Sequence, residues 1–228
     1  MAEYYTSYPR TILWLVPGGE ARVGGQEDDT QPSFTVEVDP FYISKWPITN
    51  EQYRAYDPDY RPLPHSDGDR DPAVGLSYRD ALGYAGWYAR ISKKPMRLPS
   101  EIEWEYACRA GRSGRWFFDP EEADEYLWDA RNSRGRVQPV EHTKANEFGL
   151  HATLGSVWEW TASLYRPYPL EKRLDDPEAP GKRVLRGGSY VMDREQISCS
   201  LRKAADPRER LADAGFRLVR SFGRLAGG

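Results

Sequence analysis

The chain has 228 residues, of which 39% are hydrophobic and 13% aromatic. This length fits one large domain or two small ones, and the aromatic content excludes a disordered or low-complexity chain. The 32 Lys and Arg against 35 Asp and Glu leave a formal net charge of −3, which excludes the basic footprint typical of nucleic-acid binding. We therefore expect a folded, aromatic-rich protein that has no nucleic-acid partner.

Neither a membrane segment nor a disulfide framework is visible in the sequence. No run of about 18 apolar residues occurs, and the N-terminal stretch lacks the basic and apolar regions of an export signal. Cys108 and Cys199 show no CxxC or Cys/His metal spacing, although a single bridge between them is possible. We predict a soluble chain without membrane insertion or a signal peptide. The few Asn and Gln residues also hint at a thermophilic source.

Three strands are predicted in the first fifth of the chain. One is an apolar run that ends before Pro17 and two glycines, the next alternates apolar and polar side chains, and the last follows an Asp-Pro turn. Such alternation and turn punctuation are typical of strands. The three segments are residues 11–16, 34–38 and 41–43.

Two helices follow, each with a capping residue. Thr49 or Asn50 is the expected N-cap of a short helix, and a loop rich in Asp, Pro and Gly follows at residues 57–75. Ser77 then caps a longer helix over residues 78–91, whose apolar residues recur at the helical spacing. The apolar face of this helix is expected to consist of Ala81, Tyr84, Ala85, Tyr88 and Ile91.

A second main helix and an irregular second half complete the prediction. Ser100 and Glu103 match an S-x-x-E capping box, and Gly111 ends the helix that follows. Beyond residue 112 the chain holds short aromatic or branched runs separated by Gly, Pro and Asp, without helical periodicity. These runs, at residues 137–140, 157–160, 183–185 and 216–219, predict strands in a loop-rich segment. The expected fold is α+β, in a single domain over residues 1–228.

Several segments, in this order along the chain, resemble the formylglycine-generating enzyme (sulfatase-modifying factor) family. The most specific are an RLPSE-x-EWEYA block from Arg97, G-x-VWEW from Gly155, RGGS from Arg186 and GFRL from Gly215. The resemblance covers about residues 15–220. It implies a C-type-lectin-like fold with two main helices, small antiparallel sheets and many loops, which agrees with the α+β prediction made from the residues themselves.

The resemblance also implies an oxidase chemistry for which this sequence lacks the sulfur atoms. In the formylglycine-generating enzymes two cysteines follow the GGSY-type turn, the first two residues beyond its aromatic residue and the second five residues further on. Counted from Tyr190, these positions hold Met192 and Ile197. A thioether and an alkyl group form no thiolate, so we predict no catalytic residues and no cofactor. Cys199 lies two residues out of register and is interpreted as a small buried hydrophobe.

No metal site is predicted. The related sulfoxide synthases of ergothioneine biosynthesis bind iron largely through histidines of an additional domain, whereas His65, His142 and His151 are far apart in this sequence. The family also places a structural calcium at the G-x-VWEW segment. Glu159 matches that site, but Ala152 stands where a side-chain oxygen is needed, which weakens the site because calcium prefers six to eight oxygen ligands.

Other prominent residues have structural interpretations. Three tryptophans are expected to be core anchors, and the acidic run at residues 119–125 a solvated surface. Four arginines could bind an anion, but we expect them to order loops by pairing with Asp or Glu. These residues are Trp104, Trp158 and Trp160, and Arg186, Arg202, Arg210 and Arg217.

These features favour a non-catalytic binding protein. A C-type-lectin-like fold presents variable loops on a rigid scaffold, and loss of the cysteines does not impair such a protein. Within this class the chain resembles the variable proteins of diversity-generating retroelements, which end with the diversified segment. We therefore predict a surface at residues 190–213 for an unknown protein or small-molecule ligand. Its candidate residues are Tyr190, Val191, Met192, Asp193, Leu201, Lys203, Ala205, Asp206 and Leu211.

Two alternatives stay open. A metal-dependent oxidoreductase with altered chemistry would use the same cleft, with Cys199, Asp193, Arg194 and Tyr190 as candidates for oxidation of a small thiol or amine. An accessory domain that only mediates assembly is the other. Against the retroelement version, adenine-directed mutagenesis of AAC codons cannot produce Met, Lys, Glu or Gln. The segment nevertheless contains Met192, Glu195, Gln196, Lys203 and Glu209.

Overall fold

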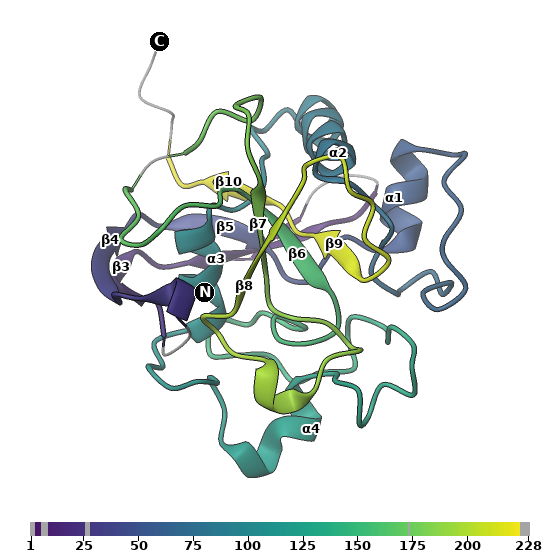
Figure 1. Cartoon of the computed structure of the whole chain (residues 1–228). Helices are drawn as coiled ribbons and strands as arrows, with labels where there is room; N and C mark the ends of the chain where they lie inside the picture. Colours follow the sequence, from purple (N-terminus) through teal and green to yellow (C-terminus); the bar gives the residue numbers. More distant parts are fainter. Residues whose placement is uncertain (1–2, 6–8, 26–27, 173, 224–228) are drawn as a thin grey trace.

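The computed structural model describes residues 3–5, 9–25, 28–172 and 174–223 (Figure 1). In these residues the strands form a four-stranded sheet in the order β1-β2-β5-β10, a β3-β4 hairpin, and a four-stranded sheet in the order β8-β7-β6-β9. The strands are β1 Glu3–Tyr5, β2 Ile12–Val16, β3 Gly19–Val23, β4 Phe34–Val38, β5 Phe41–Ser44, β6 Trp158–Leu164, β7 Arg183–Arg186, β8 Arg202–Ala205, β9 Ala214–Phe216 and β10 Val219–Ser221.

The helices begin where the capping residues predict. Thr49, Ser77 and Ser100 each accept a hydrogen bond from the third residue of their helix in a capping box, so Thr49 and not Asn50 is the first cap. The last of these helices ends at Arg109, and its C-cap residue Ala110 has a left-handed φ of 47°, one residue before the predicted Gly111. The helices are α1 Asn50–Tyr56, α2 Tyr78–Ser92, α3 Glu101–Arg109 and α4 Ala123–Tyr126, and the 3-10 turns are η1 Asp28–Thr30, η2 Pro120–Glu122 and η3 Arg194–Gln196.

The core forms where α1 and α2 meet the sheets. Tyr84 of α2 stacks on Tyr53 of α1 at a centroid distance of 5.7 Å and meets Phe216 of β9 at 5.4 Å. Figure 1 shows α1 and α2 together on one side of the molecule, away from α4. The predicted apolar face of α2 is buried except for Ile91, which is 38% exposed because it lies in the last turn of the helix. Trp104, Trp158 and Trp160 are buried, as expected of core anchors.

Two predictions for the second half are wrong. Residues 137–140 form no strand, because Pro139 has no N–H to donate and the neighbouring amides of Val137 and Val140 donate to the loop at residues 57–75. The run at residues 216–219 is divided between β9 and β10, which belong to different sheets.

Several elements carry no clear local pattern in the sequence. Strand β3 places only two of its five side chains, Ala21 and Val23, in the core, and β1 and β8 are short. The acidic run at residues 119–125 covers η2 and most of α4, with Ala123 buried, Glu122 half-buried and the other carboxylates exposed. The fold is α+β as predicted, although β6 and β9 pair in parallel.

Among the described residues, no helix is both long and apolar enough to cross a membrane.

Candidate ligand-binding surface

The predicted surface begins at a double-glycine turn after β7. Gly187 and Gly188 have φ values of 98° and 77°, in the left-handed region that glycine adopts without strain. A Cβ on Gly188 would lie 3.1 Å from Cγ1 of Ile197 and 3.5 Å from both Cδ2 of Leu201 and Sδ of Met192. Glycine therefore lets three apolar side chains converge beneath the turn.

Hydrogen bonds from two other loops fix the segment after this turn. The amide of Tyr190 donates to the carbonyl of Ser156 at 2.9 Å, and the hydroxyl of Ser133 donates to the carbonyl of Tyr190 at 3.0 Å. The amide of Ala130 donates to the carbonyl of Met192 at 2.9 Å. The path of the backbone is therefore set by the scaffold, independently of the side chains that the segment exposes.

The nine candidate residues differ in exposure, which divides them into three groups. Two side chains are exposed, five are half-buried and two are buried. The exposed residues are Val191 and Asp193, and the buried ones are Tyr190 and Ala205. The half-buried residues are Met192, Leu201, Lys203, Asp206 and Leu211.

The placement of Tyr190 and Ala205 on the exposed face is wrong. Tyr190 is 6% exposed, and its ring stacks on His65 at a centroid distance of 5.7 Å. Desolvation raises the pKa of this tyrosine above its ordinary value. Ala205 is 2% exposed and lies on β8 opposite Arg183, where its methyl group joins the core. Both residues belong to the scaffold.

The backbone that carries the other candidates runs from beside α4, along β8, to the region of α2 (Figure 1). The segment that contains η3 lies beside α4, where Arg194 donates to Asp124. The loop between β8 and β9 lies near the start of α2, where Arg210 donates to Asp80 at 2.9 Å. Lys203 on β8 lies between these two ends. We refer to these seven residues as the strip.

The two positions that hold cysteines in the resembling enzymes are packed with apolar side chains. Ile197 is fully buried in a cluster with Trp104, and Met192 is half-buried against the same cluster. Cys199 is fully buried, which confirms its interpretation as a small hydrophobe. Its Sγ lies 3.6 Å from Sγ of Cys108 and both thiols are free, so the possible bridge is not formed in this structure. Burial raises the pKa of Cys108 well above its ordinary value.

The residues proposed for an altered enzyme do not converge. Arg194 pairs with two aspartates, Tyr190 stacks on His65, Cys199 is buried and Asp193 is exposed. In the part of the chain that the structure describes, no group of three or more His, Cys, Asp and Glu side chains is placed to hold a metal ion.

At the expected calcium position a guanidinium binds the oxygen atoms. Arg217 donates from Nε and Nη2 to the two carboxylate oxygens of Glu159 at 2.6 and 2.7 Å, and Trp104 donates to the same carboxylate at 2.7 Å. Arg217 also donates to the carbonyls of Ser44 and His151, both at 3.1 Å. A buried cation of the protein itself satisfies these acceptors. The residues present therefore do not fit a calcium ion, and we derive no role for one.

A second buried network joins α3 to the strands behind the surface. Glu101 accepts from Arg186 at 3.2 Å and from Arg202 at 2.8 Å, and Glu105 accepts from Arg186 and, at 2.8 Å, from Arg109. Burial raises the pKa of Glu101, although both arginines oppose this shift. The expectation that arginines order this region by pairing is thus confirmed. The two glutamates are four residues apart and share a helix face, which is the signal that sequence reasoning missed.

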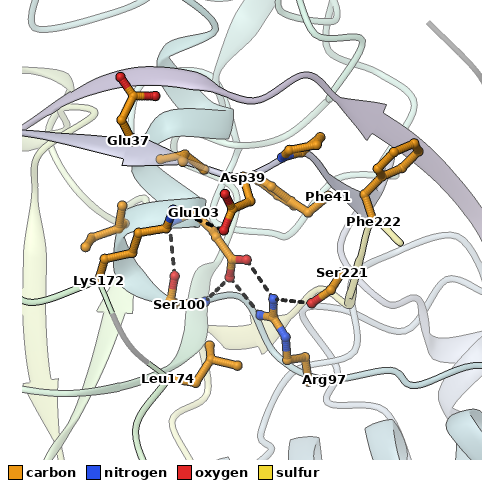
Figure 2. Close-up of a pocket in the computed structure, with 13 residues that line it drawn as sticks. Glu37, Asp39, Phe41, Arg97, Ser100, Glu103, Lys172, Leu174, Ser221 and Phe222 are labelled. Carbon is orange, nitrogen blue, oxygen red and sulfur yellow. Dashed lines mark hydrogen bonds and ion pairs between the residues drawn. The ribbon is translucent and has the colours of Figure 1, made fainter. Parts of the chain in front are cut away.

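A separate hollow of about 310 Å³ lies beside the N-terminal end of α3 (Figure 2). Arg97 donates to both oxygens of Glu103 at 2.7 Å, and Lys172 pairs with Asp39 at 3.0 Å. Leu174 and Phe222, each 52% exposed, line it as well. None of the nine candidates lines this hollow, and its basic groups are already paired with carboxylates.

Comparisons with known proteins give a family and a fold. The model of the sulfatase-modifying factor enzyme 1-like domain matches residues 3–222. The formylglycine-generating enzyme of Streptomyces coelicolor is 34% identical over 64% of this chain, a match that spans 51% of that enzyme. The inactive C-alpha-formylglycine-generating enzyme 2 of Mus musculus is 26% identical over 92% of this chain and 85% of that protein.

Two solved structures share the fold over nearly their full length. PvdO from Pseudomonas aeruginosa superposes with a TM-score of 0.86 at 24% identity, covering 97% of this chain and 98% of PvdO. The variable protein 1 of Treponema denticola also gives a TM-score of 0.86, at 19% identity, covering 96% and 98% of the two chains. These likenesses show the architecture. The chain spans about half the length of the Streptomyces enzyme, so that enzyme's activity does not transfer with the match.

Proposed function

This chain belongs to the sulfatase-modifying factor enzyme 1-like domain family, and we propose that it is a non-catalytic member that binds a ligand through residues 190–213. The observation that carries the proposal is the packing of Ile197, which is fully buried in an apolar cluster where the resembling enzymes hold a thiol. A thiolate nucleophile or copper(I) ligand needs a sulfur atom at such a position, and an alkyl group cannot supply it.

The exposed strip supports a binding role. Val191 is 55% exposed, and Met192 and Leu201 are half-buried, so part of their apolar surface is accessible. Lys203 and Asp206 are both half-buried and carry opposite charges. Apolar surface that is rimmed by polar groups is typical of interaction sites, and a rigid scaffold lowers the entropic cost of binding. The ligand class is a protein or small molecule.

The family comparisons are compatible with loss of catalysis. A relative that matches 92% of this chain is named as inactive, while other relatives are named as enzymes. The fold is shared with the Treponema variable protein, which supports the narrower proposal that residues on this strip are diversified by a retroelement. That narrower version is tested by the genome. It requires an adenine-rich template repeat that matches the codons of residues 186–220, beside a reverse transcriptase gene, and its absence would contradict diversification alone.

A displayed library tests the binding surface. One library varies four positions on the strip, Val191, Asp193, Lys203 and Asp206, and a matched control library varies four exposed positions of α2 and its C-terminal end, Arg79, Arg90, Lys93 and Lys94. We expect both libraries to fold, but only the first to give saturable binders when selected against a purified folded protein. Equal enrichment from both libraries, or unfolding of most clones of the first, would contradict the proposal.

A further inference from the structure

A basic cavity lies between the β3-β4 hairpin, the end of α3 and the segment after η3. Its volume is about 300 Å³, and its side chains are arginines and serines interspersed with glycines. The described lining residues include no carboxylate. The arginines and serines are Arg22, Ser33, Arg109, Ser113, Arg115 and Ser200. None of the three arginines belongs to residues 190–213, although Ser200 does.

Arg109 forms the floor of the cavity. Its residue is 7% exposed, and its Nε donates to Glu105 at 2.8 Å, while Nη1 and Nη2 donate to the carbonyls of Gly114 and Gly24 at 2.8 and 3.0 Å. Nη2 also lies 2.8 Å from Glu105. A guanidinium carries five N–H donors, so these contacts occupy four at most. The second hydrogen of Nη1 has no acceptor among the described residues.

Two exposed arginines, Arg22 and Arg115, and the hydroxyl of Ser113 also line the cavity. Within the described ranges, Arg22 has a single side-chain contact, to the hydroxyl of Ser33 at the long distance of 3.5 Å. Arg115 is held by the carbonyl of Ile197 at 3.2 Å, which fixes its guanidinium at the cavity edge. The hydroxyl of Ser113 has no partner in the described part of the chain. Donors therefore approach the cavity from the hairpin and from the turn after α3.

The buried network that contains Arg109 has more positive than negative charges. Three guanidiniums, those of Arg109, Arg186 and Arg202, share the two carboxylates of Glu101 and Glu105. One positive charge of this network is unmatched, and Arg109 brings it to the cavity wall. In a partly buried site such a charge is weakly screened, so the cavity attracts anions.

We propose that this cavity binds a tetrahedral oxyanion, namely the phosphate or sulfate group of a ligand. Guanidinium forks match the oxygen atoms of such groups, and hydrogen bonds to charged acceptors are the strong ones. Donors on three sides suit a tetrahedral anion better than a planar carboxylate, which one fork saturates. None of the nine candidate residues lines the cavity, although Ser200 of the same segment does, and the bound anion would contribute a negative charge that the buried network lacks.

Calorimetric titration of the full chain tests the proposal. Sodium phosphate and sodium sulfate are compared with sodium chloride at equal ionic strength. We expect saturable binding of the two oxyanions and none of chloride. Phenyl phosphate identifies the source of the group, because tighter binding than inorganic phosphate indicates an esterified ligand and equal binding indicates the free ion.

Two variants and one control localise the binding. Loss of a charge-assisted contact in Arg22→Gln is expected to weaken phosphate at least about ten-fold, and Ser113→Ala to weaken it less. Arg112→Gln removes an equal charge from the same turn, where Arg112 is 62% exposed and pairs with Glu147 outside the cavity. This control is expected to change the affinity by no more than about two-fold. Equal losses in Arg22→Gln and Arg112→Gln, or equal binding of chloride and phosphate, would overturn the proposal.

Discussion

Replacing Arg217 by methionine tests the buried cation that occupies the expected calcium position. The change removes two hydrogen bonds to Glu159 and the donors to the carbonyls of Ser44 and His151, while methionine keeps most of the apolar volume. Glu159 is fully buried, and among the described residues Trp104 is the one side-chain donor that it would retain. The variant therefore leaves a buried carboxylate without a counter-charge.

The expected loss is large. Breaking a buried ion pair by removing one partner costs about 3–5 kcal/mol of unfolding free energy, which for a chain of this length lowers the Tm by about 6–20 °C. Thermal unfolding followed by tryptophan fluorescence measures it. The double variant with Glu159→Gln removes both charges and is expected to recover part of the loss, since an amide can still accept from Trp104. A loss below about 1 kcal/mol, or strictly additive single effects, would refute the reasoning.

Three further predictions concern the thiols, the tyrosines and the strip. Because burial raises the pKa of Cys108, its thiol should react with a disulfide reagent only after unfolding, and stoichiometric reaction of the native chain at neutral pH would contradict this. Burial raises the pKa of Tyr60 and Tyr78 from the ordinary value of about 10 to about 12. The unfolded chain therefore loses these protons at a lower pH than the folded chain, so the free energy of unfolding should fall as the pH rises between these two values. Absorbance at 295 nm, which follows tyrosine ionisation, should rise for these residues only as the chain unfolds. Ionisation of both tyrosines near their ordinary pKa in the folded chain would contradict this. In a matched pair on β8, Lys203→Asp is expected to cost no more than about 1 kcal/mol and Ala205→Asp more than about 3 kcal/mol, because only the second buries an unpaired charge; thermal unfolding should separate the two.

Local signals in the sequence predict the helices well. Each capping box joins residues that are close in the chain, as Ser100 and Glu103 are, so its hydrogen bonds can be read from a short window. The sheet pairings are less visible, since the parallel contact of β6 with β9 joins Trp158 to Ala214 across many intervening residues. Pattern reasoning also placed a strand at residues 137–140, where Pro139 interrupts the donors.

The candidate site shows the same division. Family resemblance correctly directs attention to Met192 and Ile197, but it does not reveal how deeply each is buried. The sequence neighbours of Tyr190 and Ala205 alone suggest exposure. In the fold, the ring of His65 stacks on Tyr190, and Ala205 lies opposite Arg183 on the neighbouring strand. The basic cavity is invisible in the sequence because Arg22, Arg109 and Arg115 come from separate segments that only the packing of the hairpin on α3 brings together.

Turnover measured together with bound metal tests the central claim most directly. The purified full chain, with and without added copper(I), is incubated with a sulfatase-type cysteine peptide while oxygen uptake and conversion of the peptide thiol to an aldehyde are followed. The Streptomyces formylglycine-generating enzyme serves as the positive control. We predict no oxygen uptake, an unchanged peptide and no stoichiometric copper or iron by elemental analysis. Stoichiometric redox metal with peptide oxidation would contradict the account, and a Cys199→Ser variant would then show whether this buried thiol is responsible.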